Sequence, residues 1–164
     1  MVSWNTGDSL EVFEKIADPA CALAEAAYRH TSPEHRYHIA LNTAIFVYID
    51  DHGEEHLDAI EQFAVRFTRG ETQLSPALDT LVGLLRNVHQ LWTTVGADAI
   101  IAGTLDAVTA MHIEYTTKEM QIKPHATLYP YYMRTRSGIC PPYAHFIFTK
   151  SWRTTPKSYL QLLP

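Results

Sequence analysis

Four carboxylates lie within six positions near the middle of the first half of the chain, from Asp50 to Glu55. They directly follow an apolar and aromatic run. On a helix, Asp50 and Glu54 are four residues apart and Asp51 and Glu54 are three apart, so their oxygens can converge on one side. Such acids repel one another unless a cation joins them, and hard oxygen ligands suit Mg²⁺, which completes its coordination with substrate phosphates. The pattern therefore predicts a Mg²⁺ site that handles a diphosphate.

Two other interpretations of this stretch stay open. An acidic cluster is commonly a solvated helix terminus, and Gly53 favours that alternative because glycine weakens a helix. The position of the acids directly beyond a deeply apolar face argues against it. His52 and His56 are also four apart, but the sequence contains neither HExxH nor a Glu-x-x-His pair, so we interpret its nine histidines as structural or surface residues.

The elements that must position the acids are helices nearly throughout, because apolar residues recur with helical spacing. Ser32 and Pro33 predict the start of the helix that ends in the acids. Pro19 is expected to kink or interrupt the preceding helix, which runs towards His30. Residues 143–149 are better interpreted as a buried helical segment than as a strand. The expected helices run from Ser9 towards His30, from Pro33 into the acids, over 54–69 with Gly70 as C-cap, from Pro76, and over 96–120, with a turn-prone stretch at 123–137.

The composition favours one domain over residues 1–164, since 46% of the 164 residues are hydrophobic. The helical pattern predicts an all-α, helical-bundle fold for it. A net charge of −5 argues against a nucleic-acid partner. The sequence has no apolar run as long as the roughly 18 residues of a membrane span, and we expect a cytoplasmic protein. Cys21 and Cys140 lack the spacing of a disulfide framework or zinc site and are expected to be buried thiols.

Several common enzyme classes lack their minimum residues. The sequence contains no GxxxxGK[ST] phosphate loop, no GxGxxG dinucleotide loop and no GxSxG nucleophile elbow. NTPase, Rossmann and hydrolase functions are therefore disfavoured.

Two segments together resemble a known family. Phe46-Val-Tyr-Ile-Asp-Asp-His-Gly-Glu54 resembles the aspartate-rich motif of class I terpene synthases. Tyr129-Pro-Tyr-Tyr-Met-Arg-Thr-Arg-Ser-Gly138 resembles the later segment of that family, in which an arginine senses the diphosphate and a glycine four residues on sits at a helix break. The resemblance covers about residues 37–163 and looks closest to the fungal trichodiene synthase branch.

The resemblance implies a sesquiterpene synthase with the class I terpenoid synthase fold, which cyclises farnesyl diphosphate with the help of three Mg²⁺ ions. Asp50, Asp51 and Glu54 would hold metal, Arg134 would bind the diphosphate, and Ser137 with Gly138 would couple that binding to movement at a helix break. Arg136 either assists or is a surface charge. A homodimer is an expected assembly.

Aromatic side chains could present their ring faces to a carbocation in the pocket, although each is also a normal core residue. The candidates are Phe46, Tyr48, Trp92, Tyr115 and Phe146.

The second metal motif of the family, Asn-Asp-x-x-Ser-x-x-x-Glu, does not occur in these 164 residues. We therefore expect a fragment, a truncated gene model or a degenerate relative, with weakened ionisation of the substrate because half of the metal ligands would be missing. The alternative is a noncatalytic relative that acts as a helical interaction module through its apolar surface.

Overall fold

The computed structural model describes residues 10–137, 140–152 and 155–163. Within these ranges the chain is all-α, with one isolated bridge between Trp92 and Thr149. The fold class predicted from the sequence is confirmed. The helices are α1 (Leu10–Ala27), α2 (Pro33–His52), η1 (Gly53–His56), α3 (Leu57–Arg69), α4 (Pro76–Leu91), α5 (Thr94–Thr116), α6 (Tyr129–Ser137), α7 (Cys140–Phe146), η2 (Pro156–Ser158) and η3 (Leu160–Leu162).

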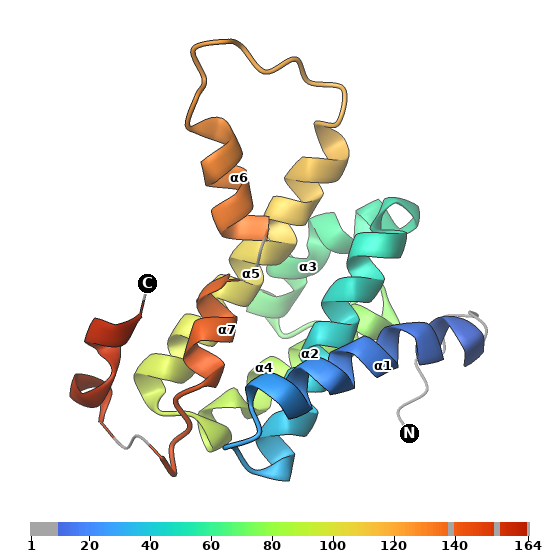
Figure 1. Cartoon of the computed structure of the whole chain (residues 1–164). Coiled ribbons are helices and arrows are strands. Elements are labelled where there is room, and N and C mark those ends of the chain that lie inside the picture. The colour runs from blue at the N-terminus through green and yellow to red at the C-terminus, as the bar shows by residue number, and fades with distance from the viewer. Residues whose placement is uncertain (1–9, 138–139, 153–154, 164) are drawn as a thin grey trace.

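Helix α5 is the centre of the bundle, since it packs against α3, α4, α6 and α7, while α2 packs between α1 and α4. The C-terminal half of α5 and the shorter α6 lie side by side and extend beyond the other helices (Figure 1). By length and composition α5 could cross a membrane. Its buried residues, which include Ala97, Ile100, Ala107 and Val108, instead form part of the core and mark it as the core helix of the bundle.

The start of α2 follows the predicted capping chemistry. The Ser32 side chain accepts a hydrogen bond from the backbone N–H of His35, and Pro33 occupies the first helical position. The long buried face of α2 then reaches from His35 to Ile49. The helix consequently carries the chain from a capped start to the acidic motif.

Helices α5 and α7 make an unusually close contact at Gly103. A Cβ atom at this position would lie 2.6 Å from Cδ of Pro142 and 3.3 Å from Cβ of Pro141. Only glycine leaves the room for the two prolines, so α7 rests directly on the backbone of α5.

Several expectations from the sequence are wrong in detail. Pro19 does not interrupt α1, which continues to Ala27 along its packing contact with α2 and does not extend to His30. The turn-prone stretch 123–137 contains α6. Helix α7 ends at Phe146, before the bridge at Thr149. Cys21 is exposed, while the side chain of Cys140 lies outside the described part of the chain.

The acidic motif does not lie on a single α-helix. Helix α2 ends at His52, and the chain turns through the 3₁₀ segment η1 before α3 begins at Leu57. The expected helix over 54–69 is thus divided in two. Because Glu54 follows the end of α2, the four-residue spacing from Asp50 does not place their side chains on one helical face.

Candidate active site

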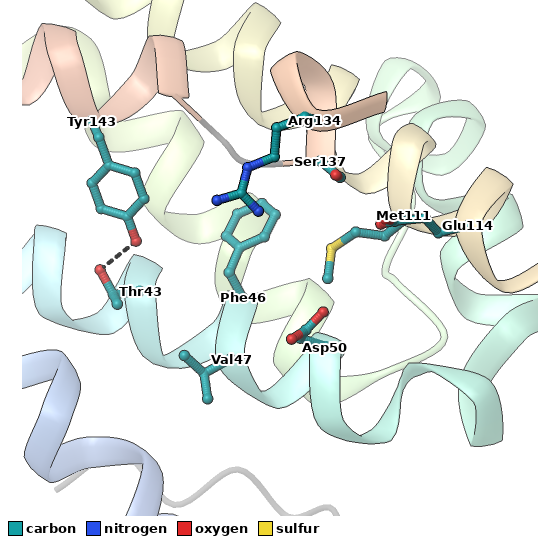
Figure 2. A pocket seen from close by; sticks show the side chains of 9 residues that line it. All are labelled: Thr43, Phe46, Val47, Asp50, Met111, Glu114, Arg134, Ser137 and Tyr143. Atoms are coloured by element: carbon teal, nitrogen blue, oxygen red, sulfur yellow. Dashed lines mark hydrogen bonds between the residues drawn. The ribbon is translucent and has the colours of Figure 1, made fainter. Parts of the chain in front are cut away.

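A cavity of about 290 Å³ lies between α2, α5, α6 and α7 (Figure 2). Its apolar wall consists of Phe46, Val47 and Met111. Its polar lining contains two acids, one arginine and three hydroxyl groups, from Asp50, Glu114, Arg134, Thr43, Ser137 and Tyr143. The cavity therefore combines an apolar surface with opposite charges supplied by helices far apart in the sequence.

Helix α2 supplies its part of the lining as one helical face. Thr43, Phe46, Val47 and Asp50 are spaced at i, i+3, i+4 and i+7, which places them on the same side of the helix. Asp50 is the exposed end of this row, whereas Phe46 is buried. The only predicted metal ligand that reaches this cavity is consequently Asp50.

Part of the cavity lining is a hydrogen-bonded pair of hydroxyl groups. Thr43 and Tyr143 share a hydrogen bond of 2.8 Å between their side-chain oxygens (Figure 2). The Thr43 hydroxyl also donates to the carbonyl of Ile39, so Tyr143 is the donor of the pair. Burial raises the pKa of Tyr143, which keeps its hydroxyl protonated and the pair intact.

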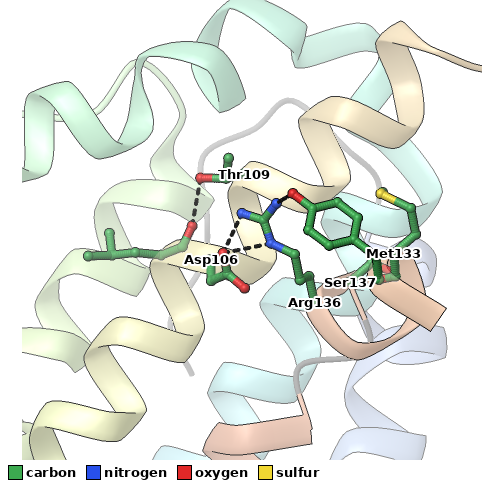
Figure 3. Close-up of polar contacts among 7 residues, drawn as sticks. Asp106, Thr109, Met133, Arg136 and Ser137 are labelled. Atoms are coloured by element: carbon green, nitrogen blue, oxygen red, sulfur yellow. Dashed lines mark hydrogen bonds and ion pairs between the residues drawn. The ribbon is translucent and has the colours of Figure 1, made fainter. Parts of the chain in front are cut away.

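Arg134 and Arg136 differ sharply although they are two residues apart on α6. Arg134 is exposed, lines the cavity and takes no part in the ion pairs found among the described residues. Arg136 binds Asp106 on α5, with 2.8 Å between Nε and Oδ1, and also contacts the hydroxyl of Tyr132 (Figure 3). Arg136 therefore fastens α6 to α5, and Arg134 presents a guanidinium available to an anion.

A second cavity, of about 390 Å³, continues from the first between α5 and α6. The two share Glu114, Arg134 and Ser137, so the guanidinium lies at their junction. Lys118 and Tyr129 also line the second cavity. The junction of the two cavities therefore carries one guanidinium and one carboxylate.

The other predicted metal ligands lie away from the first cavity. Asp51 is exposed and does not line it, and Glu54 forms an ion pair with Lys118 on the segment after α5. Among the described residues, no group of three His, Cys, Asp or Glu side chains is close enough to hold a metal ion. That Asp50, Asp51 and Glu54 share metal ions stays a prediction. Gly138 lies outside the described residues, and Ser137 lines both cavities.

Of the aromatic candidates, Phe46 alone lines the first cavity among the described residues. Trp92 is fully buried, and its indole N–H donates to the carbonyl of Phe146, itself fully buried. Tyr48 is buried with its ring stacked on that of His56. Tyr115 packs against Gly53 at the end of α2. None of these four rings lines the first cavity, and a role for them in the site stays a prediction.

Sequence reasoning missed five lining residues, which are Thr43, Val47, Met111, Glu114 and Tyr143. The α2 row could have been extended to Val47 from its helical spacing. Met111 and Glu114 are also three apart on one face of α5, but nothing in the sequence indicates that this face lies opposite α2. Their contribution depends on tertiary packing.

Comparison with known proteins gives fungal relatives. Terpene synthase BipA of Cochliobolus sativus is 30% identical over 156 residues, which cover 94% of this chain and 48% of that protein. The alpha-cuprenene synthase of Coprinopsis cinerea is 27% identical over 127 residues, covering 77% and 38% of the two chains. The (E)-beta farnesene synthase of Metarhizium brunneum is 23% identical over 143 residues, covering 86% and 43%.

The chain thus spans about half the length, or less, of the curated relatives it matches. No protein family model matches it. The homologues that it does match are fungal proteins named terpene synthases, and this relationship supports the terpene synthase family for this chain.

Proposed function

We propose that this chain forms the diphosphate-binding part of a class I sesquiterpene synthase of the trichodiene synthase branch, with farnesyl diphosphate as substrate. The observation that carries the proposal is that Asp50 and Arg134 line one cavity over an apolar wall. These residues are 84 positions apart, and they come from the two segments that resemble the family. The names of the fungal relatives support the same class of enzyme.

The charges of the cavity suit an isoprenoid diphosphate. A guanidinium binds phosphate oxygens through its planar fork of donors, and Arg134 is not engaged by a carboxylate among the described residues. The isoprenoid chain would lie against Phe46, Val47 and Met111. Burial of this apolar wall would exclude water from the reacting end of the substrate.

Magnesium fits the donors only in part. Mg²⁺ commonly uses one or two protein carboxylates together with substrate phosphates, and Asp50 with Glu114 offers that number on the cavity wall. When bound, the ion would stabilise the negative charge of the departing diphosphate. Asp51 does not line the cavity and Glu54 is paired with Lys118, so both side chains would have to move to join the ion.

The chain's own residues would hold the two ends of the substrate. Arg134 would bind the diphosphate and stabilise charge as the carbon–oxygen bond breaks. The face of the Phe46 ring would stabilise the allylic cation electrostatically. The cytoplasm as the site of this activity, and assembly as a homodimer, belong to the same proposal.

The test is titration calorimetry with inorganic diphosphate and Mg²⁺ on the full chain, comparing Arg134→Gln with Arg136→Gln. Loss of charged hydrogen bonds should weaken binding by about 10- to 100-fold in Arg134→Gln. Arg136→Gln removes the same charge two residues away, where the side chain binds Asp106, and should change binding less than about 3-fold.

Turnover of farnesyl diphosphate, followed by mass spectrometry of the hydrocarbon products, tests the reaction itself. Equal binding by the two arginine variants would contradict the proposed site. No response of the unsubstituted chain to Mg²⁺ and diphosphate would favour the noncatalytic interaction module instead.

A further inference from the structure

The end of α2 is tied to α5 by one side chain. The hydroxyl of Tyr115 donates to the carbonyl of Ile49 at 2.5 Å and to the carbonyl of Asp50 at 3.1 Å. The last carbonyls of a helix lack partners within it, and the backbone N–H of Gly53 donates only to the carbonyl of Ile49. Tyr115 therefore supplies a donor to the backbone of the residue that carries the cavity carboxylate.

The ring of Tyr115 occupies the space beside Gly53. A Cβ atom at position 53 would lie 2.6 Å from Cε2 and 2.9 Å from Cζ of this ring. The φ angle of Gly53 is −64°, which any residue can adopt, so glycine is required here for space alone. Gly53 and Tyr115 thus form one contact, in which the absent side chain makes room for the ring.

A second side chain just beyond α5 also contacts the acidic segment. The ammonium of Lys118 lies 5.5 Å from the centre of the Tyr115 ring and pairs with Glu54. Tyr115 on α5 and Lys118 just after it therefore contact the acidic segment at Asp50 and at Glu54.

We propose that Tyr115 is a positioning residue, which fixes the end of α2 so that the Asp50 carboxylate stays on the cavity wall that Arg134 also lines. Tyr115 does not line that cavity, and it acts through the backbone of Asp50. The inference rests on the proposed function, because the role of Asp50 in binding Mg²⁺ and diphosphate is part of it. The contact itself does not depend on that function.

The first experiment compares Tyr115→Phe with Tyr159→Phe in the full chain. Tyr159 is a control for the loss of a tyrosine hydroxyl, because it is more buried than Tyr115 and shares a hydrogen bond of 3.1 Å with Thr93 at the opposite end of α5. Calorimetry with Mg²⁺ and inorganic diphosphate should show about 2- to 10-fold weaker binding for Tyr115→Phe. Amide hydrogen exchange over residues 50–56 should be faster in this variant. Tyr159→Phe should change neither measurement.

A second comparison uses Gly53→Ala. Replacing glycine by alanine ordinarily stabilises a helical position, so a purely local effect would leave binding unchanged and slow exchange over residues 50–56. The contact predicts the reverse, because the new methyl group must displace the Tyr115 ring. In a Tyr115→Leu background, Gly53→Ala should add little further loss of binding, since the ring is gone.

The outcomes separate this inference from the proposed function. Unchanged binding and unchanged exchange in Tyr115→Phe would overturn the positioning role while leaving the function intact. If the unsubstituted chain does not bind Mg²⁺ and diphosphate, the proposed function fails, and exchange over residues 50–56 decides the inference. Faster exchange in Tyr115→Phe but not in Tyr159→Phe supports the contact of Tyr115 with the end of α2. Equal exchange in both variants overturns the inference.

Discussion

The two ends of α2 carry similar side chains in different surroundings. Near its start, the rings of His35 and His38 pack against Trp92, with centroid separations of 5.0 and 4.9 Å. Near its end, Phe46 and Asp50 line an open cavity. Both regions combine aromatic and titratable groups. They differ because the rings of the first region are buried, although His38 lines a cavity of about 200 Å³, whereas the second region has an exposed carboxylate and guanidinium beside its cavity.

The closed region shows how burial suppresses the charge of a titratable group. Burial, and then the neighbouring His35, lower the pKa of His38 to about 4, so its ring is neutral near pH 7. Asp50 remains exposed at the other end of the same helix. Residue type alone therefore does not identify a site, because the packing of neighbouring elements decides whether a group can meet a ligand.

The largest expected effect is the loss of stability when Trp92 is replaced, and it tests whether this side chain belongs to the core. Trp92→Ala should lower the free energy of unfolding by about 3–5 kcal/mol, because it leaves a cavity where a fully buried ring lay. Urea denaturation measures this loss. The milder Trp92→Phe should retain Mg²⁺-dependent diphosphate binding. A stable Trp92→Phe protein that no longer binds would place Trp92 in the site.

The next effect concerns pH and His38. Its pKa in the folded state is about 4, below the ordinary 6.5, so the unfolded state binds more protons between these values. The free energy of unfolding should therefore fall by about 3 kcal/mol as the pH falls from about 6.5 to below 4. His38→Phe should remove this contribution in urea titrations at several pH values. If the free energy of unfolding depends on pH in the same way in His38→Phe and in the exposed control His125→Gln, the contribution of His38 is contradicted.

At the open end of α2, Asp50→Asn and Asp51→Asn form a matched pair. Asp50 lines the cavity and Asp51 does not. Asp50→Asn should weaken Mg²⁺-dependent diphosphate binding about 10-fold, or about 1.4 kcal/mol, whereas Asp51→Asn should change it less than about 3-fold. Calorimetry decides between them. Equal losses would indicate that both acids reach the ligand when it is bound.

The smallest expected effect is on the ion pair between α5 and α6. Asp106→Asn should lower the free energy of unfolding by about 0.5–1 kcal/mol, because the pair is partly exposed. The difference from the unsubstituted chain should shrink at high salt, where charges are screened. A loss of several kcal/mol that salt does not change would indicate that the contact acts through packing instead.

Much of the fold could be predicted from the sequence, because helical spacing and caps are local signals. Ser32 and Gly70 mark helix ends that the structure contains. The contact beside Gly53 was less accessible, since the ring that packs there belongs to Tyr115, 62 residues further along the chain. The cavity was predictable as a meeting of the acidic segment with Arg134. The contribution of Met111, Glu114 and Tyr143 was not, because tertiary packing brings them there.

The contact at Gly103 links the cavity to a residue that does not line it. Because α7 rests on the backbone of α5 at Pro142, any side chain at position 103 would lift α7 outward. Tyr143 follows Pro142 directly, lines the cavity and shares a hydrogen bond with Thr43. A larger residue at position 103 would therefore shift α7 and with it Tyr143, which lines the cavity.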